Sequence, residues 1–290
     1  MNGMPLPLVL CLVSLLGLVA GTLGGLLGVG GSVIMIPGLV WLLGAAGGAA
    51  PGEQHAFQAA AMVANVAVAV PAMLRHRRAG TIDPAAVRGM VPAAAVGIVL
   101  GVAMSNLPAF RGAEGGRLLA RGLAVLLAWV VLVNLHKLWL AWRPTKPVTE
   151  TEGEPLRGAA AATRFAGVGG LMGVVAGLLG IGGGALAVPA QQQLLRRPLR
   201  RAISNSATAM CVSAPLGAAY KNLTLGSHLP PDTALVGGAA AGLVLGLMLA
   251  PTAWAGGRLG ARLTHTLPIN LIRVGFVLLM IAASWKLATR

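Results

Sequence analysis

The chain alternates between long apolar runs and short stretches that are polar or rich in glycine. Five apolar runs precede a polar stretch at 143–164, and five more follow it. Because the runs are continuous and do not alternate in polarity, they predict helices rather than the strands of a transmembrane barrel. Helices also satisfy their own backbone hydrogen bonds in lipid. The expected segments are 5–27, 32–43, 56–74, 90–104, 118–142, 165–179, 185–195, 202–220, 234–254 and 269–287.

The composition places these runs in a membrane. Hydrophobic residues make up 56% of the 290 residues and charged residues only 10%, whereas a soluble domain carries about 25% charged residues. This argues against a soluble enzyme, a disordered tail and a nucleic-acid binder, although the formal net charge is +15. The basic residues lie in short loops between apolar runs, which is typical of membrane topology. We expect an all-α polytopic integral membrane protein with about eight to ten transmembrane or re-entrant helices.

The two halves of the chain repeat one motif. The run from Gly21 to Pro37 reads GTLGGLLGVGGSVIMIP, and the run from Gly173 to Pro189 reads GVVAGLLGIGGGALAVP. Aligned without gaps, 8 of these 17 positions are identical. Small-residue bias alone explains one such match, but further echoes in the same order favour a duplication.

A second echo supports the same division of the chain. GIVLG at 97–101 resembles GLVLG at 242–246. We therefore expect a first membrane repeat at 1–142, a cytoplasmic linker at 143–164 and a second membrane repeat at 165–290.

The number of segments in each half sets the relative orientation of the halves. Five is an odd number, so the two repeats are expected to be inverted in the membrane. The basic clusters at 75–88 and 196–201 then fall on one side, with the polar linker and the expected loop at 258–262. These four regions hold most of the 22 basic residues, so the positive-inside rule makes that side cytoplasmic. We therefore expect a multi-pass membrane protein with these four regions in the cytoplasm.

The second segment of each half is too short to cross a bilayer. Segments of 12 and 11 residues reach about 17–18 Å at 1.5 Å per residue, and the hydrocarbon core is about 30 Å thick. The glycine loops that precede them are therefore expected near the midplane, approaching it from opposite sides. Eight and ten full crossings both remain open.

These glycine loops are the expected substrate site. Glycines accept positive φ and let backbone N–H groups converge, and each following helix points its N-terminus into the loop, which favours an anion. Two such loops at an inverted-repeat axis match the midplane site of secondary transporters. Proline within each short helix is expected to bend or break it. The candidate residues are Gly28, Gly30, Gly31, Ser32, Gly180, Gly182, Gly183 and Gly184, with helix breaks at Pro37 and Pro189.

Other glycines favour packing over binding. Gly21 with Gly25, and Gly173 with Gly177, have the GxxxG spacing of closely packed membrane helices. For these two pairs we expect helix contact.

The sequences GLLGVGGSVIMIP and GLLGIGGGALAVP resemble the paired signatures of the TauE/SafE family of sulfite-exporter-like membrane transporters. The resemblance covers nearly the whole chain. It implies a multi-pass permease of the bacterial inner membrane that moves small sulfur-containing or organic anions outward. We expect no enzymatic activity and no cofactor. It also leaves open a coupling ion (H⁺ or Na⁺), a homo-oligomer and the identity of the substrate.

One departure from the family pattern concerns a Thr-Ser pair that often leads into the third helix of each half. The second half has Asn205-Ser206, with Thr208 nearby, whereas the first half has Ala59-Ala60. Asn205, Ser206 and Thr208, with Gln191 of the short helix, complete the candidate substrate-binding set. For several of these the alternative is a helix cap or an inter-helix hydrogen bond, and the same alternative holds for Asn65.

The distribution of charged and titratable residues bears on three functions. The centres of the apolar segments contain no Asp or Glu, which suits an anion and provides no buried carboxylate relay. An intramembrane hydrolase with Ser32 as nucleophile requires a nearby His, and a transition-metal transporter requires a His, Cys or carboxylate cluster. The sequence predicts neither arrangement, so no catalytic or metal site is expected. His55, near Glu53, is the best titratable candidate.

Overall fold

A computed structural model describes residues 5–45, 53–110, 112–142, 159–229 and 238–268, and a few positions beyond 268. The described residues contain α-helices, short 3-10 turns and no strand, which confirms the all-α class. Most of the tenth expected segment lies outside them. The α-helices are α1 Leu6–Leu27, α2 Ser32–Ala45, α3 Gln54–Arg78, α4 Pro84–Ser105, α5 Gly112–Trp142, α6 Ala159–Leu179, α7 Gly184–Leu194, α8 Leu199–Thr224 and α9 Ala241–Thr266.

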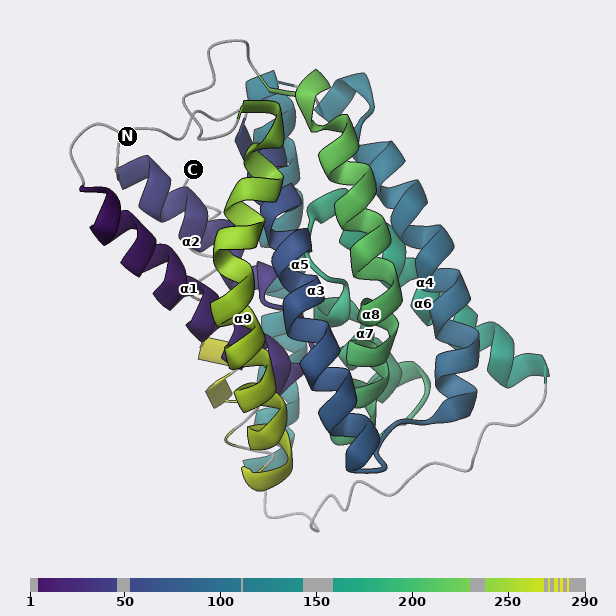
Figure 1. The fold of residues 1–290 in the computed structure, drawn as a ribbon. Helices are drawn as coiled ribbons and strands as arrows, with labels where there is room; N and C mark the ends of the chain where they lie inside the picture. Colours follow the sequence, from purple (N-terminus) through teal and green to yellow (C-terminus); the bar gives the residue numbers. More distant parts are fainter. Residues whose placement is uncertain are drawn as a thin grey trace.

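Helices α3 and α8 form the centre of the molecule. They lie side by side, with α9 and α1 on one side and α4 and α6 on the other (Figure 1). Since His55 at the start of α3 contacts Lys221 near the end of α8, the two central helices are antiparallel. The first helix of each half packs against the fourth helix of the other half, α1 on α9 and α6 on α4. The inverted relation of the two halves remains a prediction.

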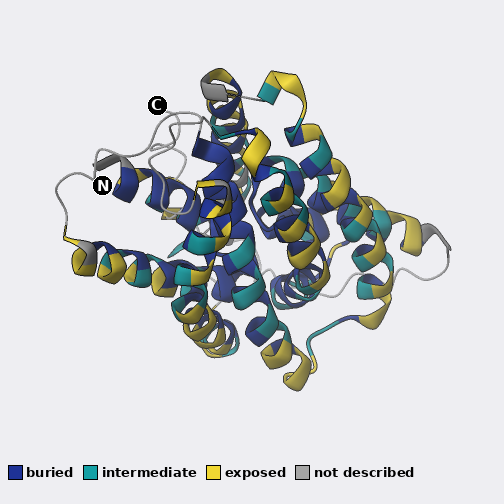
Figure 2. Cartoon of the chain, turned by 45° about the horizontal axis from the view of Figure 1, so that its top comes forward, coloured by how far each residue is buried: buried dark blue, intermediate teal, exposed yellow. Residues whose placement is uncertain are grey.

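The outer faces of the helices are apolar. Large side chains such as Leu15, Val96, Val125 and Leu247 are more than half exposed. In Figure 2 the exposed faces lie around the periphery and the buried faces turn toward the middle. Such extensive exposed apolar surface requires lipid rather than water. Helices α1, α3, α4, α5 and α6 each contain a stretch long and apolar enough to cross a membrane, so the chain is a multi-pass membrane protein, as expected.

Backbone-to-backbone contact holds the two outer helix pairs together. A Cβ on Gly173 of α6 would lie 2.7 Å from the backbone nitrogen of Ile98 on α4. A Cβ on Gly21 of α1 would lie 2.9 Å from Cα of Ala253 on α9. Gly25 and Gly177 are equally close to the facing helix. The packing interpretation of the two GxxxG pairs therefore agrees with the structure.

The second echo of the sequence pairs glycines that have different neighbours. Gly97 and Gly101 of α4 pack against α6, but Gly242 and Gly246 of α9 pack against Ala59 and Val63 of α3. The glycines of α9 that contact the first helix of the other half are Gly256 and Gly260. Packing therefore relates 97–101 to 256–260 and not to 242–246. The match of 97–101 with 242–246 misleads because glycine and other small residues are frequent in this chain, so short matches arise by chance.

Helix α9 also differs from the segment expected at 234–254. It runs to Thr266, so Arg258 and Arg262 lie on a helix and not in a loop. The two arginines are exposed while Gly256, Gly257 and Gly260 are buried. A sequence of glycines and arginines suggests a loop, but these glycines form the face that packs on the neighbouring helices. At several other helix ends the structure adds one or two turns to the expected run, as at the starts of α4, α5 and α6.

The two short helices agree with the expectation. Helix α2 has 14 residues and α7 has 11, so α7 reaches only about 17 Å. Pro37 and Pro189 lie inside these helices, which continue past them to Ala45 and Leu194. Bending at the two prolines remains a prediction. Helix α6 begins at Ala159, and the part of the expected linker at 143–158 lies outside the described residues.

Replacing a glycine in the α4–α6 contact tests this packing. Gly173→Ala is expected to lower the thermal unfolding midpoint in detergent, because the new methyl overlaps the backbone of α4, at a cost of about 1–3 kcal/mol. The matched control is Gly167→Ala on the same helix, where a Cβ meets nothing within 4 Å. The control midpoint is expected to stay the same or rise. Equal midpoints for the two variants would contradict the packing account.

Candidate functional site

The two glycine loops meet in the middle of the central helix pair. A Cβ on Gly184 would overlap the carbonyl oxygen of Gly28 and lie 2.6 Å from Cα of Val29. Both loops also contact Asn65 and Met210, which lie near the midpoints of α3 and α8. We call the contact between segments 28–32 and 180–184 the glycine crossing. Its depth agrees with the expected position near the midplane.

Positive φ angles shape both sides of the glycine crossing. Gly28 and Gly30 have φ of 64° and 81°, and Gly180, Gly182 and Gly183 have φ of 76°, 28° and 72°. A residue with a Cβ is disfavoured at such angles. The loops are thus irregular backbone that is fully enclosed by protein, the condition under which such backbone is tolerated at membrane depth.

Side chains of α3 and α8 form hydrogen bonds with backbone and side-chain groups of the first loop. The side chain of Asn65 accepts a hydrogen bond from the backbone N–H of Ser32 at 3.2 Å and donates one to Oγ of Ser32 at 2.9 Å. Ser206 of α8 donates to the carbonyl oxygen of Gly28 at 2.9 Å. Asn65 therefore makes the inter-helix hydrogen bond that was one of its two expected roles. It also occupies one of the N–H donors at the start of α2 that the sequence assigned to an anion.

Gln58 is the side chain at the glycine crossing that the sequence did not single out. It is fully buried, and neither its amide nitrogen nor its amide oxygen has a hydrogen-bond partner. A Cβ on Gly180 would lie 2.6 Å from both Cβ and Cγ of Gln58, so this residue packs directly on the second loop. A buried amide without partners is costly and calls for an explanation. Asn65 lies on the same face of α3, two turns further along.

The loop contacts also correct the alignment of the two halves around this site. Gly28 contacts Ile203 and Gly180 contacts Gln58, while Asn65 and Met210 share both Gly30 and Gly182. Gln58 is thus the equivalent of Ile203, and Asn65 of Met210. Ala60 then corresponds to Asn205, one position away from the pairing of Ala59-Ala60 with Asn205-Ser206. The first half therefore contributes its polar groups at Gln58 and Asn65.

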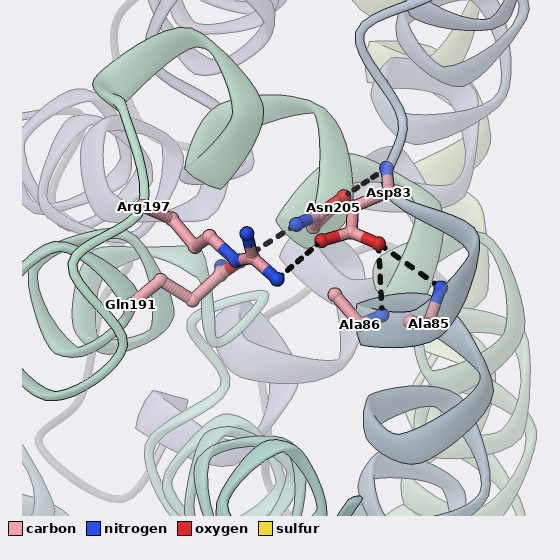
Figure 3. Close-up of polar contacts among 6 residues, drawn as sticks. All are labelled: Asp83, Ala85, Ala86, Gln191, Arg197 and Asn205. Carbon is pink, nitrogen blue, oxygen red and sulfur yellow. Dashed lines mark hydrogen bonds and ion pairs between the residues drawn. The ribbon is translucent and has the colours of Figure 1, made fainter. Parts of the chain in front are cut away.

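Gln191 and Asn205 belong to a separate network at one end of the central pair (Figure 3). Asn205 donates to Oε1 of Gln191 at 3.0 Å and accepts from the backbone N–H of Asp83 at 2.9 Å. The carboxylate of Asp83 accepts from the N–H groups of Ala85 and Ala86 and pairs with Arg197 at 2.8 Å. These contacts tie α7, α8 and the start of α4 together.

The remaining predicted residues divide between these two places. The glycines, Ser32 and Ser206 lie at the glycine crossing, whereas Gln191 and Asn205 lie in the Asp83–Arg197 network. Thr208 donates to the carbonyl oxygen of Ser204 on its own helix at 2.8 Å. The structure thus brings together only part of the predicted set, and a substrate role for each member remains a prediction.

A second polar cluster lies at the opposite end of α3 and α8. The ammonium of Lys221 is 2.8 Å from Nδ1 of His55 and 2.7 Å from Oγ of Ser105. His55 contacts the carbonyl oxygen of Phe110 at 2.7 Å, and its ring lies 4.7 Å from that of His228. The sequence singled out His55 alone. Lys221 lies in the last turn of a helix, where a lysine ordinarily reaches solvent, and nothing in the pattern signals its burial.

The described residues also bear on the two alternative functions, an intramembrane hydrolase and a metal transporter. Ser32 has Asn65 as its side-chain partner, and no histidine contacts it among the hydrogen bonds of the described residues. Within the same part of the chain, no group of three or more His, Cys, Asp or Glu side chains is arranged to hold a metal ion.

Comparison with known proteins places this arrangement in a family. A family profile described as "Sulfite exporter TauE/SafE" matches residues 13–287. The chain is 27% identical over 297 residues to the "Probable membrane transporter protein MamO" of Magnetospirillum gryphiswaldense. It is 26% identical over 301 residues to the protein of the same name of Paramagnetospirillum magneticum. Both alignments cover 95% of this chain but 44% of the relative, so the chain spans less than half the length of these relatives. No solved structure matches it.

The Asp83–Arg197 network yields a stability prediction. Asp83→Ala is expected to lower the free energy of unfolding by about 3 kcal/mol, because it removes the N-cap of α4 and leaves the buried guanidinium of Arg197 unpaired. The control is Glu114→Ala, an exposed acidic residue in the first turn of α5. Thermal or chemical unfolding in detergent measures both. A loss no larger than that of the control would mean that this network does not fasten the helix ends.

Proposed function

Because this chain belongs to the sulfite exporter TauE/SafE family, we propose that it is a permease, not an enzyme, that exports small sulfur-containing or organic anions. The observation that carries the proposal is the glycine crossing with the unpartnered amide of Gln58 packed against it. A fully buried polar group without partners, packed on the second glycine loop, suits a site whose missing hydrogen-bond partner is the substrate.

The chemistry of the glycine crossing suits an anion. It provides backbone N–H groups, the hydroxyls of Ser32 and Ser206 and two side-chain amides. The described hydrogen bonds and ion pairs bring no carboxylate to it. In a region of low dielectric, a buried carboxylate would repel an anion strongly. Amide and hydroxyl donors bind an anion without requiring a buried permanent charge.

The positions of the two polar networks support alternating access as the mechanism of this permease. The Asp83–Arg197 network lies at one end of α3 and α8, the Lys221–His55 cluster lies at the other end, and the glycine crossing lies between them. About 20 residues of α3 separate the two ends, or about 30 Å. Both ends are buried, so the arrangement is closed on both sides. Opening one network while the other stays closed would expose the crossing to one side at a time.

Anion flux into proteoliposomes tests the proposal. Labelled sulfite is offered to the purified full chain, with sulfate, thiosulfate, sulfoacetate and acetate as competitors. Saturable sulfite movement is expected, and Gly182→Leu is expected to abolish it because a branched side chain at positive φ would fill the crossing. Absence of movement of all five anions would sink the anion proposal, and selective movement of a cation or a neutral solute would replace it.

Gln58 provides a sharper test than the glycines. Gln58→Leu removes an amide that has no partner, so it is expected to leave the unfolding midpoint unchanged or raised while lowering sulfite flux about tenfold. The loss corresponds to one hydrogen bond to an anion. Gln193→Leu, at an exposed glutamine of α7, is the matched control. Undiminished flux in Gln58→Leu would show that this amide does not contact the substrate.

A further inference from the structure

The cluster around Lys221 has an unusual balance of charge for a buried site. Lys221, His55 and Ser105 are each no more than 1% exposed. The structure gives the ammonium two partners, an imidazole nitrogen and a hydroxyl, and both are neutral acceptors. Among the hydrogen bonds and ion pairs of the described residues, no carboxylate contacts Lys221 or His55. A buried cation without a negative partner is costly.

The hydrogen bonds define which atoms carry the protons. Nε2 of His55 lies 2.7 Å from the carbonyl oxygen of Phe110, and a carbonyl only accepts, so Nε2 carries the hydrogen. Nδ1 of a neutral imidazole is then an acceptor, and it takes a hydrogen bond from Lys221. Ser105 donates its own hydrogen to the carbonyl oxygen of Val102 at 2.8 Å, so its Oγ also accepts from Lys221. An ammonium can donate three hydrogen bonds, and these two contacts use two of them.

The cluster lies next to the glycine crossing along α3. His55 and Gln58 are three residues apart on this helix, so they share one side of it. Gln58 in turn packs on Gly180. Three polar side chains, Lys221, His55 and Gln58, thus lie in succession between the end of the helix pair and the second glycine loop.

The equivalent position at the other end is also basic. The offset of 145 residues that relates Gln58 to Ile203 and Asn65 to Met210 relates His76 to Lys221. His76 is fully buried, and its Nδ1 lies 3.0 Å from Nε2 of His265. Both ends of the central pair therefore place a nitrogen base at the same position of their helices.

We propose that Lys221, held by His55 and Ser105, binds a small oxyanion at the end of the bundle opposite the arginine-rich loops, in series with the glycine crossing. This inference rests on the proposed anion transport and assigns it a second site. The Lys221 ammonium supplies the positive charge that the glycine crossing lacks. Its third N–H can donate a hydrogen bond to sulfite, sulfate or a carboxylate. By the positive-inside rule this end faces outward, so an exported anion would reach it last.

Anion binding to the purified full chain in detergent tests the assignment directly. Millimolar sulfite or sulfate is expected to raise the thermal unfolding midpoint of the unaltered chain. Lys221→Met is expected to weaken this binding about tenfold or more, the scale of one charge-assisted hydrogen bond. Lys221→Arg is expected to retain most of it. Arg258→Met, at an exposed basic residue of α9, is the matched control and should bind as the unaltered chain does.

The outcomes separate this inference from the proposed function. Equal anion binding by Lys221→Met and the unaltered chain overturns the assignment, as does absence of binding in both. If Lys221→Met fails to fold, Ser105→Ala replaces it and is expected to weaken binding, since it removes a group that positions the ammonium. Anion binding that depends on Lys221, with no anion flux, would contradict the proposed transport function but not the assignment of this second site.

A lipid headgroup phosphate has the same chemistry as a free oxyanion, and a further arm distinguishes the two. The midpoint is measured with phosphatidylglycerol added in place of sulfite, and with phosphatidylcholine as the neutral comparison. A Lys221-dependent rise with phosphatidylglycerol and none with the free anions overturns the assignment to a soluble anion. The complete burial of Lys221 favours the small anion.

Discussion

The close approach of backbones without intervening side chains is the constraint on which this structure depends. Lipid gives no hydrogen bonds to exposed peptide groups, so irregular backbone at mid-depth has to be enclosed by protein. Here glycine allows the close approach at the crossing, where Gly28 meets Gly184, and in the flanking α1–α9 and α4–α6 contacts. Were the flanking helices held apart by larger side chains, the short helices α2 and α7 would lose the walls that cover their first turns.

The same constraint explains how the two halves differ. Both loops are glycine-rich, yet the central helices that enclose them carry different residues at equivalent positions. Asn65 of α3 corresponds to Met210 of α8, and Gln58 corresponds to Ile203. The polar groups that serve the crossing therefore come mainly from α3, with Ser206 of α8 as an addition. In the sequence, the second half has a polar version of the family's Thr-Ser pair, Asn205-Ser206, whereas the first half has Ala59-Ala60. The geometry shows that Asn205 serves the network at the helix ends.

Periodicity and motif spacing predicted the helices, the two undersized segments and the meeting of their loops, because each depends on local composition. They did not predict the extent of α9, since GGRLGAR has the residues of a loop and only tertiary contact makes it helical. Nor did they predict the buried state of Lys221 or the lack of partners at Gln58. Both depend on which distant residues come to lie beside the start of α3, Ser105 of α4 for Lys221 and Gly180 for Gln58, and no local pattern encodes that. The short echo at 242–246 failed for the opposite reason, because small residues match too easily.

The central claim is that the glycine crossing becomes accessible from each side of the membrane in turn and that substrate occupies it. The most direct measurement is thiol labelling of Ser32→Cys, an almost isosteric change at a fully buried position of the crossing, in a chain whose free cysteines Cys11 and Cys211 are replaced. A small membrane-impermeant thiol reagent is applied to right-side-out and inside-out vesicles, with the cysteine-free chain as background. The account predicts labelling from both sides, slowed by sulfite in both orientations. Absence of labelling from both sides, or labelling that no transported anion slows, would contradict it.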